Sequence, residues 1–258
     1  MQYFVVDAFS EELFTGNPAG VCVLDSPISA ELMQQIAAEN NLSETAFVRE
    51  EKDHYKLRWF TPRAEIDLCG HATLGTAFVI RNFVDKNAEQ MRFSTKSGML
   101  HVHVRGDQYA LDFPARMPKP VSVTQMMAAA IKAEPVEAHL SRDLMLVLKS
   151  EEEVMSLQPD FDKLSVLEPG LGVIVTAKGK QHDFVSRCFF PKLGVPEDPV
   201  TGSAHCNLIP YWAERLGKNS MTAAQLSARG GVLYCEHNGD RVEIGGKAVL
   251  YLRGELMV

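Results

Sequence analysis

Cys69, Gly70 and His71 follow one another directly before an apolar stretch, a pattern typical of the start of a helix. A glycine permits a tight turn and the close approach of a ligand to the backbone. The first turn of a helix offers free N–H groups and the positive end of the helix dipole. With Ala72, the segment is predicted to bind a carboxylate or an enolate-like oxygen, which Cys69 and His71 would face. The alternative is that His71 caps the helix and Cys69 is a small buried residue.

A second segment of the same kind runs from residue 197 to residue 206, again a loop, a glycine and the start of an apolar helix. Asp198, Thr201, Gly202 and Ser203 are its candidate ligand-binding residues. The alternative is simple capping, with Ser203 or Thr201 as the N-cap and Asp198 as a favourable charge near the helix start. Two helix starts aimed at one ligand would form an anion clamp, so the pair indicates a substrate that carries carboxylates.

Glu44 is the candidate acid and base. It lies among short polar residues, just before the apolar run Thr45-Ala46-Phe47-Val48. A partly desolvated carboxylate has a raised pKa and can shuttle a proton. The corresponding residue in the second half of the chain is Val173, so this acid breaks an otherwise repeated pattern. A residue that breaks the pattern favours chemistry over folding; the alternative is a surface glutamate at a turn.

The repeated pattern predicts how these residues are positioned. Three pairs of segments match in the same order: 55–62 with 184–191, 65–72 with 197–204, and 96–111 with 228–244. In each half they predict a strand that ends near a proline, an apolar helix (72–83 and 204–216), and a hairpin with Gly-Asp at its turn. Such self-similarity indicates an internal duplication. Two similar halves are expected to meet around a cleft that holds the ligand.

Shorter signals complete this outline. Ser29 is expected to cap a helix that buries Leu32, Met33, Ile36 and Ala37, and Ser150 with Glu153 has the spacing of a capping box. Residues 117–120 contain two prolines and are expected to form the crossing between the halves, and residues 248–252 are strand-like.

Composition excludes several classes of protein. The net charge is −7 and no run of Lys or Arg occurs, so neither a nucleic-acid nor a membrane partner is expected. No signal peptide is recognisable, and no window reaches the ~18 apolar residues of a membrane span. Five scattered cysteines without a CxxC pair favour a reducing, cytoplasmic location. Cys69-x-His71 is not a recognised zinc spacing, and no nucleotide-binding or pyridoxal-phosphate motif is present, so we expect no metal and no cofactor.

Several motifs together resemble one known family. They are Val6-Asp7-Ala8-Phe9, residues 14–20 (FTGNPAG), residues 41–47 (NLSETAF), residues 69–73 (CGHAT) and residues 197–204 (EDPVTGSA). Over nearly the whole chain the sequence resembles the PhzF-like proteins of the phenazine-biosynthesis family. The resemblance implies the α/β (α+β) fold of the diaminopimelate-epimerase class: two pseudo-symmetric halves, each a mixed, largely antiparallel sheet around a central helix. It implies halves of 1–117 plus 249–258, with a returning C-terminal strand, and 118–248.

The resemblance also implies an activity. In this family a glutamate moves a proton on a small cyclic or amino-acid-like carboxylate, without metal or organic cofactor, commonly in a homodimer. Glu44 matches that glutamate; His71, Asp198 and Ser203 match the other active-site positions, and Gly70 an adjacent backbone contact. The remaining expected substrate-binding residues are Cys69, Ala72, Thr201 and Gly202.

Two alternatives remain open. Cys69 falls at one of the two catalytic cysteine positions of the related epimerases, and Thr201 at the other, so the first alternative is a Cys69-dependent epimerase or dehydratase. The second is a non-catalytic small-molecule-binding protein of the same fold, because fold alone does not determine function.

Overall fold

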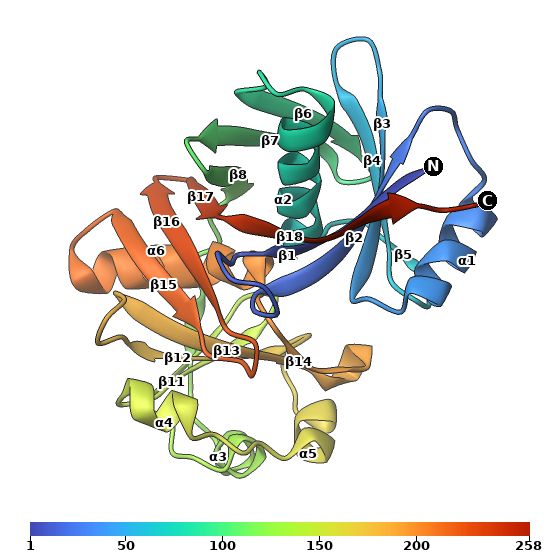
Figure 1. The fold of residues 1–258 in the computed structure, drawn as a ribbon. Coiled ribbons are helices and arrows are strands. Elements are labelled where there is room, and N and C mark those ends of the chain that lie inside the picture. Colours follow the sequence, from blue (N-terminus) through green and yellow to red (C-terminus); the bar gives the residue numbers. More distant parts are fainter. The chain divides into compact units, whose positions relative to one another are not determined.

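The chain folds into two units, which are described here one at a time. The computed structural model describes residues 1–258; unit 1 comprises Met1–Asp112 and Gly245–Val258, and unit 2 comprises Phe113–Ile244. Each unit combines a mixed sheet with helices, as Figure 1 shows. The mixed α/β fold predicted from the sequence is confirmed.

In unit 1 the sheet follows the order β18–β1–β2–β3–β4–β6–β7–β8. The pairs β2–β3 and β4–β6 are parallel, and the other pairs in this order are antiparallel. The strands are β1 (Gln2–Ala8), β2 (Asn17–Leu24), β3 (Glu44–Glu50), β4 (Tyr55–Phe60), β5 (Glu65–Ile66, paired with β4), β6 (Gln90–Thr95), β7 (Gly98–Arg105), β8 (Gln108–Pro114) and β18 (Ala248–Glu255).

Helix α2 (Gly70–Val79) is the central helix of unit 1. It contacts β1, β2, β3 and β18, and the strands surround it in Figure 1. Its side chains are buried on all sides, which explains why the sequence shows a continuous apolar run instead of an amphipathic stripe. The helix continues into one π-helical turn, η1 (Ile80–Val84). The predicted helix over 72–83 is therefore present, with its last turn widened.

Helix α1 (Ala30–Asn40) covers the other face of the unit 1 sheet. Met33, Ile36 and Ala37 are buried against residues of β1, β2, β3 and β4. Ser29 is its N-cap, and its hydroxyl accepts a hydrogen bond from the Leu32 N–H at 3.2 Å. The cap predicted from the sequence is confirmed. Asn41, the first residue after the helix, adopts a left-handed conformation, and the chain then leads into β3.

Unit 2 repeats the order of unit 1. Its pairings run β9–β10–β11 antiparallel, β11–β12 parallel, β12–β13 antiparallel, β13–β15 parallel and β15–β16 antiparallel. The strands are β9 (Lys119–Val121), β10 (Glu137–Leu140), β11 (Leu144–Val147), β12 (Val173–Lys178), β13 (Phe184–Phe190), β14 (Val195–Asp198), β15 (Ser220–Gln225), β16 (Gly231–Asn238) and β17 (Arg241–Gly246). The internal repeat predicted from the sequence is present strand by strand.

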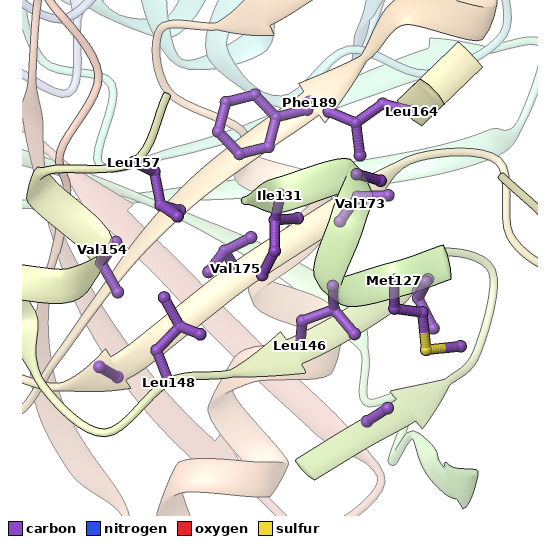
Figure 2. Close-up of a cluster of buried hydrophobic side chains, with 14 of the residues drawn as sticks. Met127, Ile131, Leu146, Leu148, Val154, Leu157, Leu164, Val173, Val175 and Phe189 are labelled. Atoms are coloured by element: carbon purple, nitrogen blue, oxygen red, sulfur yellow. The ribbon is translucent and has the colours of Figure 1, made fainter. Parts of the chain in front are cut away.

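Helix α6 (His205–Leu216) is the counterpart of α2, and the 3-10 turn η3 (Gly202–Ala204) precedes it. The other helices of unit 2 are α3 (Gln125–Ile131), α4 (Glu151–Met155), α5 (Phe161–Val166) and the 3-10 turn η2 (Pro191–Leu193). Met127, Ile131, Val154 and Leu164 of α3–α5 pack on Phe189 and its neighbours in the sheet (Figure 2).

The predicted capping box at Ser150 forms only in part. The Ser150 hydroxyl accepts from the Glu153 N–H at 3.3 Å, but the Glu153 carboxylate accepts from the N–H of Lys149, one residue earlier than a capping box requires. The predicted Gly-Asp turns lie at Gly106 and Gly239, both at positive φ. None of the helices combines the length and apolar character needed to cross a membrane.

Candidate functional site

Glu44 opens β3 and is held beside the start of β2. In the parallel β2–β3 pair, Ala19 lies opposite Glu44, which places Asn17, the first residue of β2, near the same end. Gly16 sets the entry of this strand: its φ is +68°, and a Cβ there would lie 2.3 Å from the carbonyl oxygen of Ala8. Only glycine fits this turn without a shift of the backbone.

His71 is the centre of the group in unit 1. Its Nε2 lies 3.0 Å from Oε2 of Glu44, and its Nδ1 lies 3.2 Å from Nδ2 of Asn17. The sulfur of Cys69 lies 3.5 Å from Nδ1 and 4.0 Å from Nε2, so it faces the ring. The side chain of His71 is 7% exposed and that of Glu44 is 16% exposed. The structure therefore brings an acid, an imidazole and a thiol together in a nearly dry environment.

Burial and neighbouring charges change the pKa values of Cys69 and His71. Burial raises the pKa of the Cys69 thiol, and the negative charge of Glu44 acts in the same direction. Burial by itself lowers the pKa of His71. The charges and hydrogen bonds of Cys69 and Glu44 outweigh it and raise that pKa well above its ordinary value. The imidazole of His71 therefore holds its proton more tightly than an ordinary histidine does.

The start of α2 is not closed by a side-chain cap. The N-cap position is occupied by Cys69, whose side chain makes no capping hydrogen bond, and α2 begins at Gly70. His71 lies within the first turn and is not the cap that the alternative interpretation required. Ala72 is fully buried.

In unit 2, Asp198 and Thr201 are joined directly. The Thr201 hydroxyl donates to Oδ2 of Asp198 at 2.6 Å. The side chain of Gln225 spans the same loop: its Oε1 accepts from the Thr201 N–H at 2.9 Å, and its Nε2 donates to the Asp198 carbonyl at 2.7 Å. Thr201 makes no capping hydrogen bond with its side chain. Gly202 is buried and opens η3.

Ser203 lies beside a guanidinium group. Arg142 donates from Nη2 to the Ser203 Oγ at 3.1 Å, and its Nε and Nη2 donate to Oδ2 of Asp143 at 3.0 and 2.6 Å. Asp143 is completely buried, and its Oδ1 accepts from the Gly172 N–H. Arg142 is 35% exposed, so a fixed positive charge faces solvent next to Ser203. This arrangement can bind a carboxylate.

The sequence prediction missed Asn17, Arg142 and Gln225. Asn17 was part of the family motif at residues 14–20, but its spacing from His71 carries no signal of contact. Arg142 and Gln225 are far in sequence from Ser203 and Thr201, and only strand pairing brings them close. The strand register of the structure relates two of these residues: Ala19 pairs with Glu44 and Leu144 pairs with Val173, so Asn17 and Arg142 occupy equivalent positions.

Glu44, Cys69 and His71 form a group that could hold a metal ion, since one ligand atom from each lies within 4.8 Å of the others. The expectation of no metal considered only the Cys69-x-His71 spacing. Glu44 joins this pair through the fold, from a strand that precedes α2 by a long stretch of chain.

Comparison with known proteins places the chain in context. The profile of the family described as "Phenazine biosynthesis-like protein" (PhzC-PhzF) matches residues 6–254. An uncharacterized isomerase of Pseudomonas aeruginosa is 52% identical over 257 residues, which cover 99% of this chain and 98% of that protein.

Solved structures also resemble this chain. A PhzF-family protein of Enterococcus faecalis superposes with a TM-score of 0.98 at 52% identity, over 100% of this chain and 99% of that one. A probable proline racemase of Agrobacterium radiobacter superposes with a TM-score of 0.65 at 8% identity, over 100% of this chain and 93% of that one. The latter likeness shows the fold alone.

Proposed function

We propose, from the premise that this chain belongs to the phenazine biosynthesis-like (PhzC/PhzF) family and is an isomerase, that Glu44 is the general acid and base of its reaction. The reaction is the removal of a proton from a carbon next to an activated position of a small cyclic or amino-acid-like carboxylate, followed by its return at another carbon. A C–H bond breaks as the Glu44 carboxylate takes up the proton, the carboxyl proton exchanges with solvent, and the new C–H bond forms as the Glu44 carboxyl gives up the exchanged proton.

The observation that supports this proposal most strongly is the 3.0 Å contact between Glu44 Oε2 and His71 Nε2. A carboxylate that is to accept and return a proton must be held still and kept from water. His71 holds Glu44 from one side, and the surrounding protein covers most of both side chains. His71 also supplies positive charge beside the negative charge that develops on the substrate.

The start of α2 supplies the second element of the mechanism in unit 1. The first residues of the helix, Gly70 and His71, receive no side-chain cap from Cys69, and in the proposal their N–H groups bind an oxygen of the substrate. In the proposed reaction these groups stabilise an enolate-like oxygen while Glu44 holds the proton.

The candidate residues of unit 2 are proposed to bind and orient substrate. Asp198 would orient the substrate through its carboxylate, and Ser203 with Arg142 would bind a substrate carboxylate. The contacts that support this are the fixed Asp198–Thr201 hydrogen bond and the exposed Arg142 guanidinium beside Ser203. Neither group is placed to remove a proton from carbon in this proposal, so their loss should weaken binding and orientation more than proton transfer.

The experiment is deuterium uptake in heavy water. The protein is incubated with a panel of small carboxylates and amino acids, and mass spectrometry reports which compound gains deuterium. Wild type is compared with Glu44→Gln, which has the same shape but cannot carry the proton. We expect uptake in wild type and a loss of ~10²–10⁴-fold in Glu44→Gln, the usual contribution of one acid–base group.

A second candidate is favoured by one observation, the position of Cys69 Sγ at 3.5 Å from His71 Nδ1. A thiol beside an imidazole can become a thiolate base, as in an epimerase or dehydratase. Against it, the position equivalent to the second epimerase cysteine holds Thr201, whose hydroxyl donates to Asp198. Uptake that survives in Glu44→Gln and disappears in Cys69→Ser would replace the proposal with this candidate. Ligand-induced thermal stabilisation without uptake would favour a binding protein.

A further inference from the structure

The side chains of Glu44, Cys69 and His71 offer one carboxylate oxygen, one sulfur and one imidazole nitrogen, the donor types that bind zinc in proteins. They come from two elements, with Glu44 on β3 and the other two at the start of α2. All three ligand atoms lie within 4.8 Å of one another, and both Cys69 and His71 are buried. The set is complete in unit 1 and has no equivalent in unit 2, where Val173, Thr201 and Ser203 occupy these positions.

We infer that Glu44, Cys69 and His71 form a binding site for a thiophilic divalent cation, Zn²⁺ or Cd²⁺, with one coordination position open to solvent or to an exogenous ligand. The inference concerns binding only and does not depend on the proposed acid–base role of Glu44.

The three ligand atoms can reach tetrahedral coordination after rotation of the Cys69 side chain. Ligands at zinc–donor distances of about 2.0 to 2.3 Å are separated from one another by about 3.3 to 3.6 Å in a tetrahedron. His71 Nε2 lies 3.0 Å from Glu44 Oε2, whereas Cys69 Sγ lies 4.0 Å from Nε2 and 3.5 Å from Nδ1. The sulfur must therefore move toward Nε2, by rotation of the Cys69 side chain, for all three atoms to bind one cation.

Asn17 supports the imidazole in the orientation that a metal needs. Its amide lies 3.2 Å from Nδ1 of His71, on the side of the ring opposite Nε2. Histidine ligands are usually oriented by a hydrogen bond from the other ring nitrogen. A half-turn of the Asn17 amide exchanges its N–H for its carbonyl oxygen, which then accepts the Nδ1 proton and leaves Nε2 free for the cation.

Binding has a defined proton balance. The thiol proton of Cys69 and the proton on Nε2 of His71 leave to solvent as the bonds to the metal form. Glu44 Oε2 is buried and lies 3.0 Å from Nε2 of His71, so coordination would exchange this contact for a bond to the metal. The occupied site could no longer move a proton, and the cation would compete with the substrate for the same residues.

The experiment titrates untagged, metal-free protein with Cd²⁺ and records the ultraviolet thiolate-to-cadmium charge-transfer absorption. We expect the band to saturate at one Cd²⁺ per chain and to be absent in Cys69→Ser. Cys206→Ser is the matched control: Cys206 is also buried and also near the start of a central helix, but has no Glu or His partner of this kind, and the variant should keep the band.

The other two ligands are tested by affinity. His71→Asn and Glu44→Gln, each checked for folding by circular dichroism, should weaken Zn²⁺ binding measured by calorimetry at least ~100-fold, since even outer partners of metal ligands contribute 10- to 100-fold. A band that persists in Cys69→Ser would overturn the inference, as would unchanged Zn²⁺ affinity in both His71→Asn and Glu44→Gln. If one of these variants does not fold, the Cys69→Ser and Cys206→Ser pair still decides.

Discussion

Units 1 and 2 each hold the loop before the central helix with an equivalent arginine–glutamate ion pair. Arg58 on β4 binds Glu65 with Nε–Oε1 and Nη2–Oε2 distances of 2.7 and 2.9 Å, and Arg187 on β13 binds Glu197 with the same two distances. Each guanidinium also lies over a phenylalanine two residues later in its strand, at 5.1 and 5.3 Å from the ring centroid. The duplicated frame has kept the residues that position the loop before each central helix.

The residues at the helix starts differ. The carbonyl oxygen of Cys69 accepts a hydrogen bond from the Thr73 hydroxyl at 2.6 Å. The equivalent carbonyl oxygen of Thr201 accepts a hydrogen bond from Nδ1 of His205 at 3.0 Å. Burial lowers the pKa of His205 to about 4, so this histidine is neutral and structural. His71, beside Glu44, has its pKa raised. The comparison teaches that a repeated frame can hold a buried neutral histidine in one unit and, in the proposed mechanism, a histidine that takes part in chemistry in the other.

The largest expected difference in stability comes from the two ion pairs. In Arg58→Met, Glu65 keeps Lys96 at 2.6 Å, whereas in Arg187→Met, Glu197 loses this bidentate partner and the carbonyls of Val154 and Leu157 lose their donor. We expect a loss of about 3 kcal/mol for Arg187→Met and about half of that for Arg58→Met, because breaking a buried pair is costlier than weakening a shared one. Denaturant unfolding measures both; equal losses would contradict the difference drawn between the units.

The second prediction concerns His205. Its folded pKa of about 4 lies below the ordinary value of 6.5, so between these pH values the unfolded chain takes up a proton that the folded chain does not. The free energy of unfolding should therefore fall by about 3 kcal/mol as the pH drops from 6.5 to 4.

His205→Thr, which copies Thr73 of unit 1, should lose this component of the pH dependence, even though the variant is less stable overall. The measurement is the stability of wild type and variant at several pH values. A difference between the two proteins that does not change with pH would show that His205 is not a buried neutral histidine.

The third prediction tests Asn17 as a positioning residue for His71. Asn17 serves either ring state, since its amide can donate to a neutral Nδ1 or accept from a protonated one. Asn17→Leu can do neither, and we expect turnover to fall by 10- to 100-fold, the range for lost outer partners. Asn17→Asp should favour the protonated ring and shift the pH profile of turnover to higher pH. Nitrogen NMR of His71 reports the tautomer; an unchanged spectrum in both variants would remove Asn17 from this role.

The smallest expected effect is that of Ser203→Ala. Asp143 keeps Arg142 in place without the serine, so stability should change by no more than about 0.5 kcal/mol. The loss of activity should be smaller than in Asn17→Leu, and it should appear as weaker substrate binding, that is, as a higher KM. Arg142→Leu removes the charge itself and should raise KM more than Ser203→Ala does. The reverse order would mean that the serine, and not the guanidinium, contacts the substrate.

Much of the fold could be predicted from the sequence because the two halves of the chain repeat one pattern. The strand that contains Arg58 and the strand that contains Arg187 share their residue pattern, and the Gly-Asp turns at Gly106 and Gly239 mark equivalent hairpins. Glu44 stood out because Val173 replaces it in the repeat. The π-helical turn after Val79 could not be predicted, since nothing in the residues 80–84 distinguishes it from ordinary helix.

The partners of the candidate residues were harder to predict than the residues themselves. Gln225 joins Asp198 to Thr201 from the end of another strand, and Asn17 meets His71 across 54 positions of sequence. Such contacts depend on strand register, which local sequence does not specify. Glu44 lies near Cys69 for the same reason, so a local sequence motif could not reveal that Glu44, Cys69 and His71 form one group.

In the proposed mechanism, Glu44 is the group that carries the proton. The most direct test is the rate of deuterium incorporation into the substrate, once the panel has identified it, at saturating concentration in wild type, Glu44→Gln and Glu51→Gln. Glu51 is the matched control, because it is a partly buried glutamate of the same unit that pairs with Arg49. We expect a loss of ~10²–10⁴-fold in Glu44→Gln and near wild-type exchange in Glu51→Gln. Exchange at the wild-type rate in Glu44→Gln would contradict the proposed mechanism.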